Sequence, residues 1–92
     1  LRENRRRLVD MVGRTPGLSL VTPDAGVVAF PRFGHRVSSD DFAHGLIERR
    51  GIFVLPGSAF ETEGHVRINL GMEPASFSRA MDEFSDYCRT LS

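Results

Sequence analysis

Arg67 is the residue of this 92-residue sequence best suited to binding chemistry, because it lies between two apolar residues in Val66-Arg67-Ile68. The alternation of apolar and polar residues from His65 to Leu70 predicts a strand that carries Arg67 on one face. A guanidinium held on a sheet face needs an anionic partner, since burying it unpaired is costly. Its planar fork matches a carboxylate through two parallel hydrogen bonds. On spacing alone, however, an edge-strand arginine that reaches water or a nearby glutamate is the more common case.

The other reactive side chains form no pattern that supports catalysis. His35, His44 and His65 lack metal-ligand spacing, and Cys88 lies on the apolar stripe of a predicted helix, so neither a zinc site nor a cysteine–histidine pair is supported. No serine lies in a nucleophile-elbow sequence, and neither common glycine-rich phosphate loop is present. The sequence also contains no lysine, which rules out Schiff-base chemistry by these residues alone. We therefore predict no catalytic residue and no metal ligand.

Charge and composition restrict the partners of the chain. Twelve basic residues, all arginine, balance twelve acidic ones, which argues against a dedicated nucleic-acid-binding domain. The cluster Arg5-Arg6-Arg7 is interpreted as one solvated helix face, although it could meet phosphate or an acidic partner. No apolar run approaches the roughly 18 residues that cross a membrane. The single cysteine, Cys88, indicates a reducing, cytoplasmic setting.

Hydrophobic periodicity predicts the element order helix, two strands, helix, two strands, helix. The first helix is expected over residues 1–13, with an apolar stripe formed by Leu1, Leu8, Val9 and Val12. Strands are expected over 18–22 and 27–33, on either side of the turn sequence Pro23-Asp24-Ala25-Gly26, which is a hairpin signal. Residues 27–30 are almost continuously apolar, which is typical of a strand covered on both faces.

The second half of the chain repeats this alternation. A helix opens at Ser38-Ser39-Asp40-Asp41 and ends at Gly51, with a buried stripe formed by Phe42, Leu46 and Ile47. A short strand over 52–55 is broken by Pro56-Gly57-Ser58, and a loop then runs to Gly64. The last helix begins at Glu73-Pro74. Its stripe is predicted to consist of Phe77, Met81, Phe84, Cys88 and Leu91.

Together these elements predict one α+β domain over residues 1–92. Its expected architecture is a two-layer α/β sandwich, in which helices pack on one face of a small, largely antiparallel sheet. The sequence starts at Leu1, directly in helix-like residues, so we expect it to be part of a larger protein.

Four segments carry a resemblance to a known family. The segment Leu55-Pro56-Gly57-Ser58-Ala59-Phe60, followed by Gly64-His65-Val66-Arg67-Ile68-Asn69-Leu70-Gly71, resembles the C-terminal part of class I/II aminotransferases. These are fold-type I enzymes that depend on pyridoxal phosphate. Asn4-Arg5-Arg6 is similar to the segment at the start of the family's small domain. The run from Pro23 to Phe30 is similar to a turn and strand of that domain. The resemblance covers essentially all 92 residues.

Two positions depart from the family pattern V-x-P-G-x-x-F-G, gap, G-x-x-R-[IL] and its P-x-G-G-x-[FY] turn. Glu61 stands where the family usually has glycine, which predicts a reshaped loop before Arg67. Ala25 replaces the first glycine of the turn, which predicts altered dihedral angles there. Neither position touches Arg67.

The resemblance implies a role for individual residues. Arg67 would bind the α-carboxylate of an amino-acid or keto-acid substrate, and Ser58 and Phe60 would lie in the loop at the entrance. The cofactor, pyridoxal 5'-phosphate, would be held by a lysine of a preceding large domain of the same chain, in a homodimer. Because the sequence has no lysine, the 92 residues alone are expected to be inactive.

The sequence is therefore compatible with two classes of function. The first is the substrate-binding C-terminal domain of an aminotransferase, or of a close decarboxylase or synthase relative. The second is a stand-alone ligand- or protein-binding module, since small α+β folds host many functions. A coding sequence with a lysine-bearing region upstream would favour the first class. The amino donor and the keto-acid acceptor are not specified by the sequence.

Overall fold

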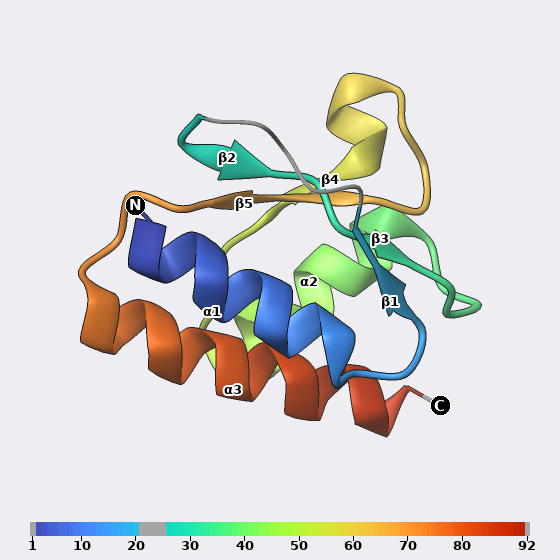
Figure 1. Cartoon of the computed structure of the whole chain (residues 1–92). Coiled ribbons are helices and arrows are strands. Elements are labelled where there is room, and N and C mark those ends of the chain that lie inside the picture. Colours follow the sequence, from blue (N-terminus) through green and yellow to red (C-terminus); the bar gives the residue numbers. More distant parts are fainter. Residues whose placement is uncertain (1, 21–25, 92) are drawn as a thin grey trace.

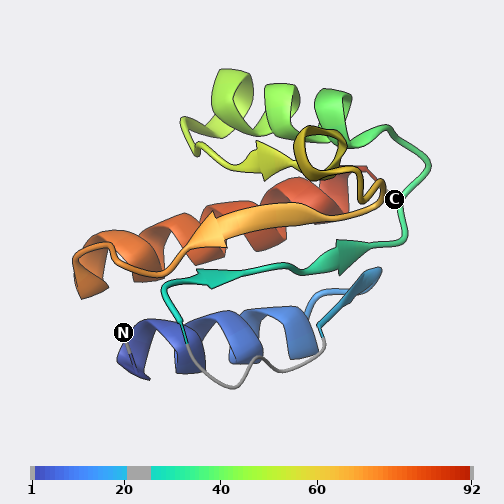
Figure 2. The ribbon, with the colours of Figure 1, turned by 90° about the horizontal axis from the view of Figure 1, so that it is seen from above.

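The computed structural model describes residues 2–20 and 26–91. Its helices are α1 (Arg2–Gly13), α2 (Ser39–Arg50), α3 (Pro74–Thr90) and a short 3-10 helix, η1 (Gly57–Phe60). Its strands are β1 (Leu18–Ser19), β2 (Val28–Ala29), β3 (Arg32–Phe33), β4 (Leu55–Pro56) and β5 (Val66–Asn69). The strands lie on one side of the helices (Figure 1), and α3 runs behind β5 when the sheet is viewed from above (Figure 2). This is the small α+β domain that the sequence predicts.

β5 is the central strand of the main sheet, whose order is β2-β5-β4 with antiparallel pairing on both sides. The pairing continues beyond the assigned strands. The amide of Leu70 donates to the carbonyl of Val27 at 2.7 Å, and the amide of Phe33 donates to the carbonyl of Gly64 at 2.9 Å. One register therefore joins residues 27–33 to residues 64–70, which contain the strands expected from the sequence over 27–33 and 65–70.

The predicted antiparallel pair before α2 is confirmed where the structure describes it. Leu18 and Ser19 of β1 pair with Phe33 and Arg32 of β3 in a two-stranded sheet. Residues 21–25, which include most of the predicted turn and Ala25, lie outside the described residues.

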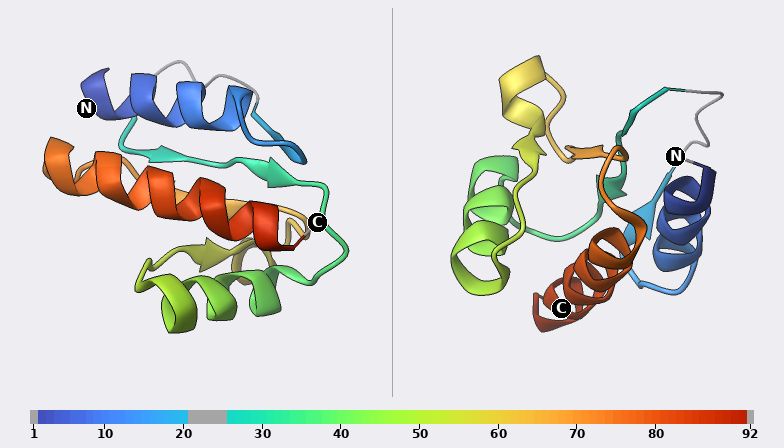
Figure 3. Two further views of the ribbon diagram at one scale, coloured as in Figure 1. Left: turned by 90° about the horizontal axis from the view of Figure 1, so that it is seen from below. Right: turned by 90° about the vertical axis from the view of Figure 1, so that its left-hand side faces the viewer.

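The core lies between the sheet and the three helices. Helix α3 lies between α1 and α2 (Figure 3), and it buries Phe77, Met81, Phe84 and Cys88, while Leu91 packs partly buried against the same core. The predicted stripe of the last helix is therefore confirmed. Across the core, the rings of Phe33 and Phe42 stack with centroids 4.2 Å apart.

The stripes predicted for the first two helices are partly wrong. Val9 is 41% exposed and Ile47 is 47% exposed. Leu8 and Val12 in α1, and Phe42 and Leu46 in α2, are buried as predicted, and the other buried positions are Asn4, Met11, Ser39 and Ala43. Leu1, the remaining predicted position, lies outside the described residues. The buried positions of each helix follow one helical stripe with spacings of three and four. The predicted stripes were centred on the wrong residues because each buried stripe includes a polar residue, Asn4 in α1 and Ser39 in α2.

The helix ends follow the expected capping chemistry. The hydroxyl of Ser38 accepts a hydrogen bond from the amide of Asp41 at 3.1 Å, and α2 ends at Gly51 with φ 69°. The carboxylate of Glu73 accepts from two amides of the first turn of α3, each at 3.0 Å. Local sequence therefore fixes where α2 and α3 begin.

Two strand predictions need correction. Residues 27–30 are not covered on both faces, because Val27 and Phe30 are 55% and 44% exposed. The strand predicted over 52–55 is shifted to Leu55–Pro56. Proline is tolerated there because β4 is an edge strand of the main sheet. After it, η1 occupies the segment for which an irregular loop was expected.

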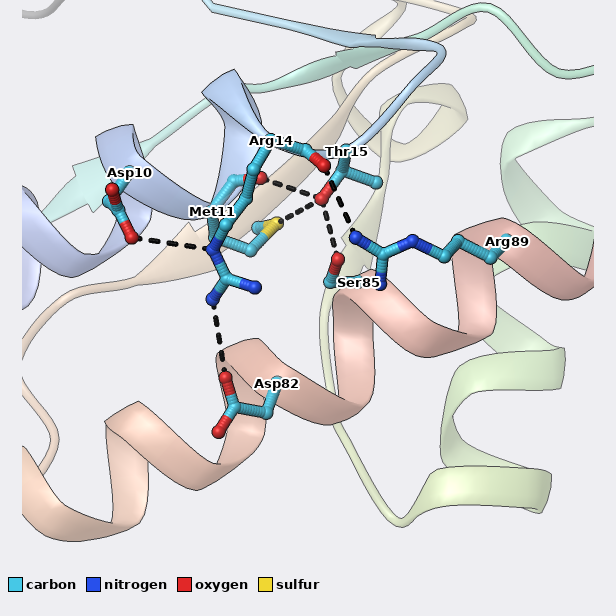
Figure 4. A network of polar contacts seen from close by, with 7 residues as sticks. All are labelled: Asp10, Met11, Arg14, Thr15, Asp82, Ser85 and Arg89. Atoms are coloured by element: carbon cyan, nitrogen blue, oxygen red, sulfur yellow. Dashed lines mark hydrogen bonds and ion pairs between the residues drawn. The ribbon is translucent and has the colours of Figure 1, made fainter.

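A polar network attaches the end of α1 to α3 (Figure 4). The hydroxyl of Thr15 donates to the carbonyl of Met11 at 2.6 Å and lies 2.6 Å from the hydroxyl of Ser85, and both hydroxyls are buried. Arg14 forms an ion pair of 3.2 Å with Asp82 of α3. These contacts fix the helical layer that supports β5.

Candidate functional site

Arg67 lies in the middle of β5, on the sheet face opposite the three α-helices. Exposure alternates along the strand: Val66 and Ile68 are buried, and Arg67 and Asn69 are exposed. The three α-helices lie on one side of the sheet (Figure 1), and Val66 and Ile68 belong to the core on that side. The predicted alternation is therefore confirmed, and it places the guanidinium on an open face.

Two apolar residues flank Arg67 on the neighbouring strands. Leu55 of β4 is its partner in the antiparallel register. On the other side, Ala29 pairs with Ile68, so the next residue, Phe30, faces Arg67. Within residues 2–20 and 26–91, no ion pair involves Arg67. A guanidinium between apolar neighbours, without an internal carboxylate, is suited to an external anion.

A hollow adjoins this row of side chains. It has a volume of about 660 Å³ and is lined by Ser19, Leu20, Phe30, Arg32, Phe60, Thr62 and His65. Phe30 thus belongs both to the hollow and to the row that contains Arg67. The ring of Phe60 meets that of Phe30 edge to face, with centroids 5.3 Å apart.

The two other predicted site residues, Phe60 and Ser58, lie in different surroundings. Phe60 lies in the wall of the hollow, and Phe30 connects it to Arg67. Ser58 does not line the hollow. Its hydroxyl donates to Asp40 at 2.6 Å, and its amide donates to the hydroxyl of Ser39 at 3.0 Å. Ser58 is therefore bonded to the first turn of α2.

The loop before Arg67 accommodates Glu61 in a conformation that glycine favours. Glu61 has φ 57° and ψ 36°, and it ends η1 as a left-handed cap. The amide of Thr62 donates to the carbonyl of Gly57 at 2.8 Å. A Cβ atom at Gly57 would lie 1.8 Å from the carbonyl oxygen of Thr62, so only glycine fits there. Glu61 adopts the left-handed backbone itself, at a cost of roughly 1–2 kcal/mol.

Asn4 supports the site from behind and was missed by the sequence reasoning. Its side-chain amide donates to the carbonyls of Leu70 and Met72 at 2.9 and 2.7 Å, and its side chain is 2% exposed. These bonds hold the end of β5 against α1. The available signal was a polar residue on the buried stripe of a helix. The neighbouring Arg5 donates to the carbonyl of Gly26, whereas Arg6 is exposed as expected.

The remaining reactive groups form no second site in the described part of the chain. Burial raises the pKa of the Cys88 thiol to about 12, so this residue stays a neutral thiol. His44 pairs with Glu48 at 2.9 Å on the surface of α2. Among the described residues, no group of three or more His, Cys, Asp or Glu side chains could hold a metal ion. Within the same ranges, no helix combines the length and apolarity that crossing a membrane requires.

Comparisons with known proteins show which family the chain resembles. Residues 1–84 match the family model described as aminotransferase class I and II. The chain is 30% identical over 86 residues to capreomycidine synthase of Streptomyces vinaceus, which covers 92% of the chain and 22% of that protein. It is 31% identical over 83 residues to an aspartate aminotransferase of Pyrococcus horikoshii, which covers 87% of the chain and 21% of that protein.

Solved structures show the same fold. A pyridoxal-phosphate-dependent aminotransferase from Streptococcus suis superposes with a TM-score of 0.94 at 23% identity, over 99% of the chain and 24% of that structure. An aspartate aminotransferase from Rhodobacter sphaeroides gives a TM-score of 0.88 at 25% identity, over 98% of the chain and 24% of that structure. The chain thus spans less than a quarter of the length of these relatives. On the match over residues 1–84, the chain belongs to the class I and II aminotransferase family.

Proposed function

We propose that this chain is the substrate-binding C-terminal domain of a pyridoxal-phosphate-dependent aminotransferase, and that Arg67 binds the α-carboxylate of its amino-acid and keto-acid substrates. The observation that carries this proposal is the position of Arg67, on an open sheet face between Phe30 and Leu55. Charge-assisted hydrogen bonds contribute roughly 1.5–3 kcal/mol each. Two such bonds fix the substrate carboxylate, and with it the bond at Cα that reacts.

The open face also fits a contact with a further domain. Val28, Phe30 and Leu55 place apolar side chains on it, and Phe30 is 44% exposed. Exposed apolar side chains that lie together mark contact surfaces. The proposed occupant is the large cofactor-binding domain of the same polypeptide, which would close over the carboxylate and exclude water. We further propose that the complete enzyme is a cytoplasmic homodimer.

The cofactor belongs to that other domain. When bound, pyridoxal 5'-phosphate supplies the electron sink of the reaction, and in this family a lysine binds its aldehyde. The present chain contains no lysine, so it does not fit the cofactor's covalent site. Its own contribution is to bind and orient the substrate. The isolated chain is accordingly proposed to be inactive in transamination.

Substitution of Arg67 in the full-length enzyme tests the proposal. We expect Arg67→Ala to raise KM for the amino-acid substrate sharply and to lower kcat, because both binding and orientation of the carboxylate are lost. Arg36→Ala is the matched control, since Arg36 is also an exposed arginine but lies outside β5. Unchanged kinetic constants for Arg67→Ala would show that the assigned role is wrong.

A further inference from the structure

Glu63 joins the loop before β5 to the start of α2. Its carboxylate accepts two hydrogen bonds from Ser39, one from the backbone amide at 2.5 Å and one from the hydroxyl at 3.0 Å. Ser39 is the first residue of α2 and is fully buried. A carboxylate is favourable there, because the amides at a helix N-terminus carry partial positive charge. Glu63 therefore occupies both donor groups of one buried residue.

The same serine holds the other end of the loop. The hydroxyl of Ser39 accepts from the amide of Ser58 at 3.0 Å while it donates to Glu63. The hydroxyl of Ser58 donates to Asp40 at 2.6 Å. We call Ser39, Asp40, Ser58 and Glu63 the loop clamp. It fixes both ends of the segment 58–63 to a single turn of α2.

The clamped segment has little freedom of its own. The amide of Thr62 closes it onto the carbonyl of Gly57 at 2.8 Å, and Glu61 adopts the left-handed conformation described above. The segment projects from the sheet on the side away from α3 (Figure 3). Its position therefore depends on the clamp and on its contact with the sheet.

That contact is made by Phe60. Its ring meets Phe30 edge to face at 5.3 Å, and Phe30 faces Arg67 across β2 and β5. We propose that Glu63 is a positioning residue that holds Phe60 against Phe30, and thereby sets the wall of the hollow beside Arg67. The consequence for substrate binding rests on the proposed function of Arg67, whereas the placement of Phe60 does not.

Substitutions of Glu63 and Glu61, two glutamates of the same loop, distinguish the effect of the loop clamp from the effect of losing a negative charge. Glu63→Gln keeps the size of the side chain but replaces one accepting oxygen with a donor, so the two bonds from Ser39 can no longer each have an oxygen of their own. Glu63→Asp keeps the charge and shortens the reach. Glu61→Gln removes the same charge from an exposed side chain that makes no hydrogen bond to another described residue.

Nuclear magnetic resonance of the 92-residue chain tests the placement directly. In Glu63→Gln we expect exchange of the Ser39 amide to accelerate about tenfold or more, and the contacts between the rings of Phe60 and Phe30 to be lost. Contacts between Phe33 and Phe42 report on the core and are expected to persist. For both measurements, we expect Glu63→Asp to give values between those of Glu63→Gln and the unsubstituted chain. Glu61→Gln should give the same values as the unsubstituted chain. Unchanged Ser39 exchange and unchanged Phe60 contacts in Glu63→Gln would overturn the proposal.

Kinetics of the full-length enzyme test the consequence for the site. We expect Glu63→Gln to raise KM for the amino-acid substrate by about tenfold while kcat changes less, with part of the loss recovered in Glu63→Asp. Loss of the Phe60 contacts without any change in KM would overturn the role of the clamp at the site. Failure of Arg67→Ala to raise KM would instead contradict the proposed function, so the two failures are distinguishable.

Discussion

Leu55 lies directly opposite Arg67 in the antiparallel pairing of β4 with β5. Facing residues in such a pair have Cβ atoms about 5 Å apart, which is close enough for a cross-strand ion pair when the residue types allow it. Leucine at this position provides no such partner. Among residues 2–20 and 26–91, this register leaves the guanidinium without a carboxylate partner and available to an external one.

The substitution Leu55→Glu should place a carboxylate opposite Arg67 that competes with the substrate. The new carboxylate would pair with Arg67 and occupy the fork proposed to bind substrate. We expect KM for the amino-acid substrate to rise about tenfold in the full-length enzyme, since an internal ion pair must be broken first. Leu55→Gln is the control, because it has the same shape without the charge. Equal effects of the two substitutions would show that pairing with Arg67 is not the cause.

The buried hydroxyl pair of Thr15 and Ser85 makes a stability prediction for the 92-residue chain. Thr15 donates to Met11, so Ser85 is the donor in the 2.6 Å contact between the two hydroxyls. We expect Ser85→Ala to lower the free energy of unfolding by about 1 kcal/mol in urea titrations. Ser78→Ala, on the same helix but less buried, corrects for the helix propensity of alanine. A loss no larger than that of Ser78→Ala would contradict the account.

For Gly45→Ala, we predict a change in the free energy of unfolding opposite in sign to the one that helix propensity gives. Alanine is normally favoured over glycine in a helix by about 1 kcal/mol. A Cβ atom at Gly45, however, would lie 1.9 Å from the hydroxyl oxygen of Tyr87 on α3. We expect Gly45→Ala to lower the free energy of unfolding by about 1–3 kcal/mol, with part recovered when Tyr87→Phe is added.

Gly13→Ala serves as the matched control for that experiment. Gly13 ends α1, and a Cβ atom there would meet nothing within 4 Å. This substitution should be neutral or stabilising in the same thermal or urea unfolding measurement. A stabilising effect of Gly45→Ala would show that the close approach of α2 to Tyr87 is absent in solution.

Because Cys88 is buried, we predict that the free energy of unfolding falls at alkaline pH. Burial raises its pKa from 9.0 to about 12 in the folded chain. Between these values the unfolded chain loses its thiol proton and the folded chain keeps it, so the free energy of unfolding falls as pH rises. The share due to Cys88 should reach about 1.4 kcal/mol per pH unit above pH 9. Urea titrations of the unsubstituted chain and of Cys88→Ala should therefore converge between pH 8 and 10. Parallel pH profiles would contradict this.

Local patterns predicted the elements whose signals are contained in one segment. The stripe from Phe77 to Cys88 was identified because its periodicity repeats over three turns, and the buried residues match it. The exposed face of β5 was identified from the alternation around Arg67. The caps at Ser38 and Glu73 followed from residue type and position.

Features that depend on distant partners could not be read in this way. Asn4 bonds to carbonyls 66 and 68 residues away, and Thr15 meets a hydroxyl 70 residues away. The neighbours of Arg67, Phe30 and Leu55, follow only from the register of three strands. Ser39 was predicted as part of a helix start, but its hydrogen bonds to Glu63 join it to a residue 24 positions away.

The most direct test of the central claim compares two substrates in the full-length enzyme: its preferred amino acid, and the amine that lacks only the α-carboxylate. We predict that the ratio of their kcat/KM values falls by about a hundredfold or more in Arg67→Gln, because two charge-assisted bonds to the carboxylate are lost. The amine alone should be nearly unaffected by the substitution. An equal loss of kcat/KM for both substrates would show that Arg67 does not bind the carboxylate.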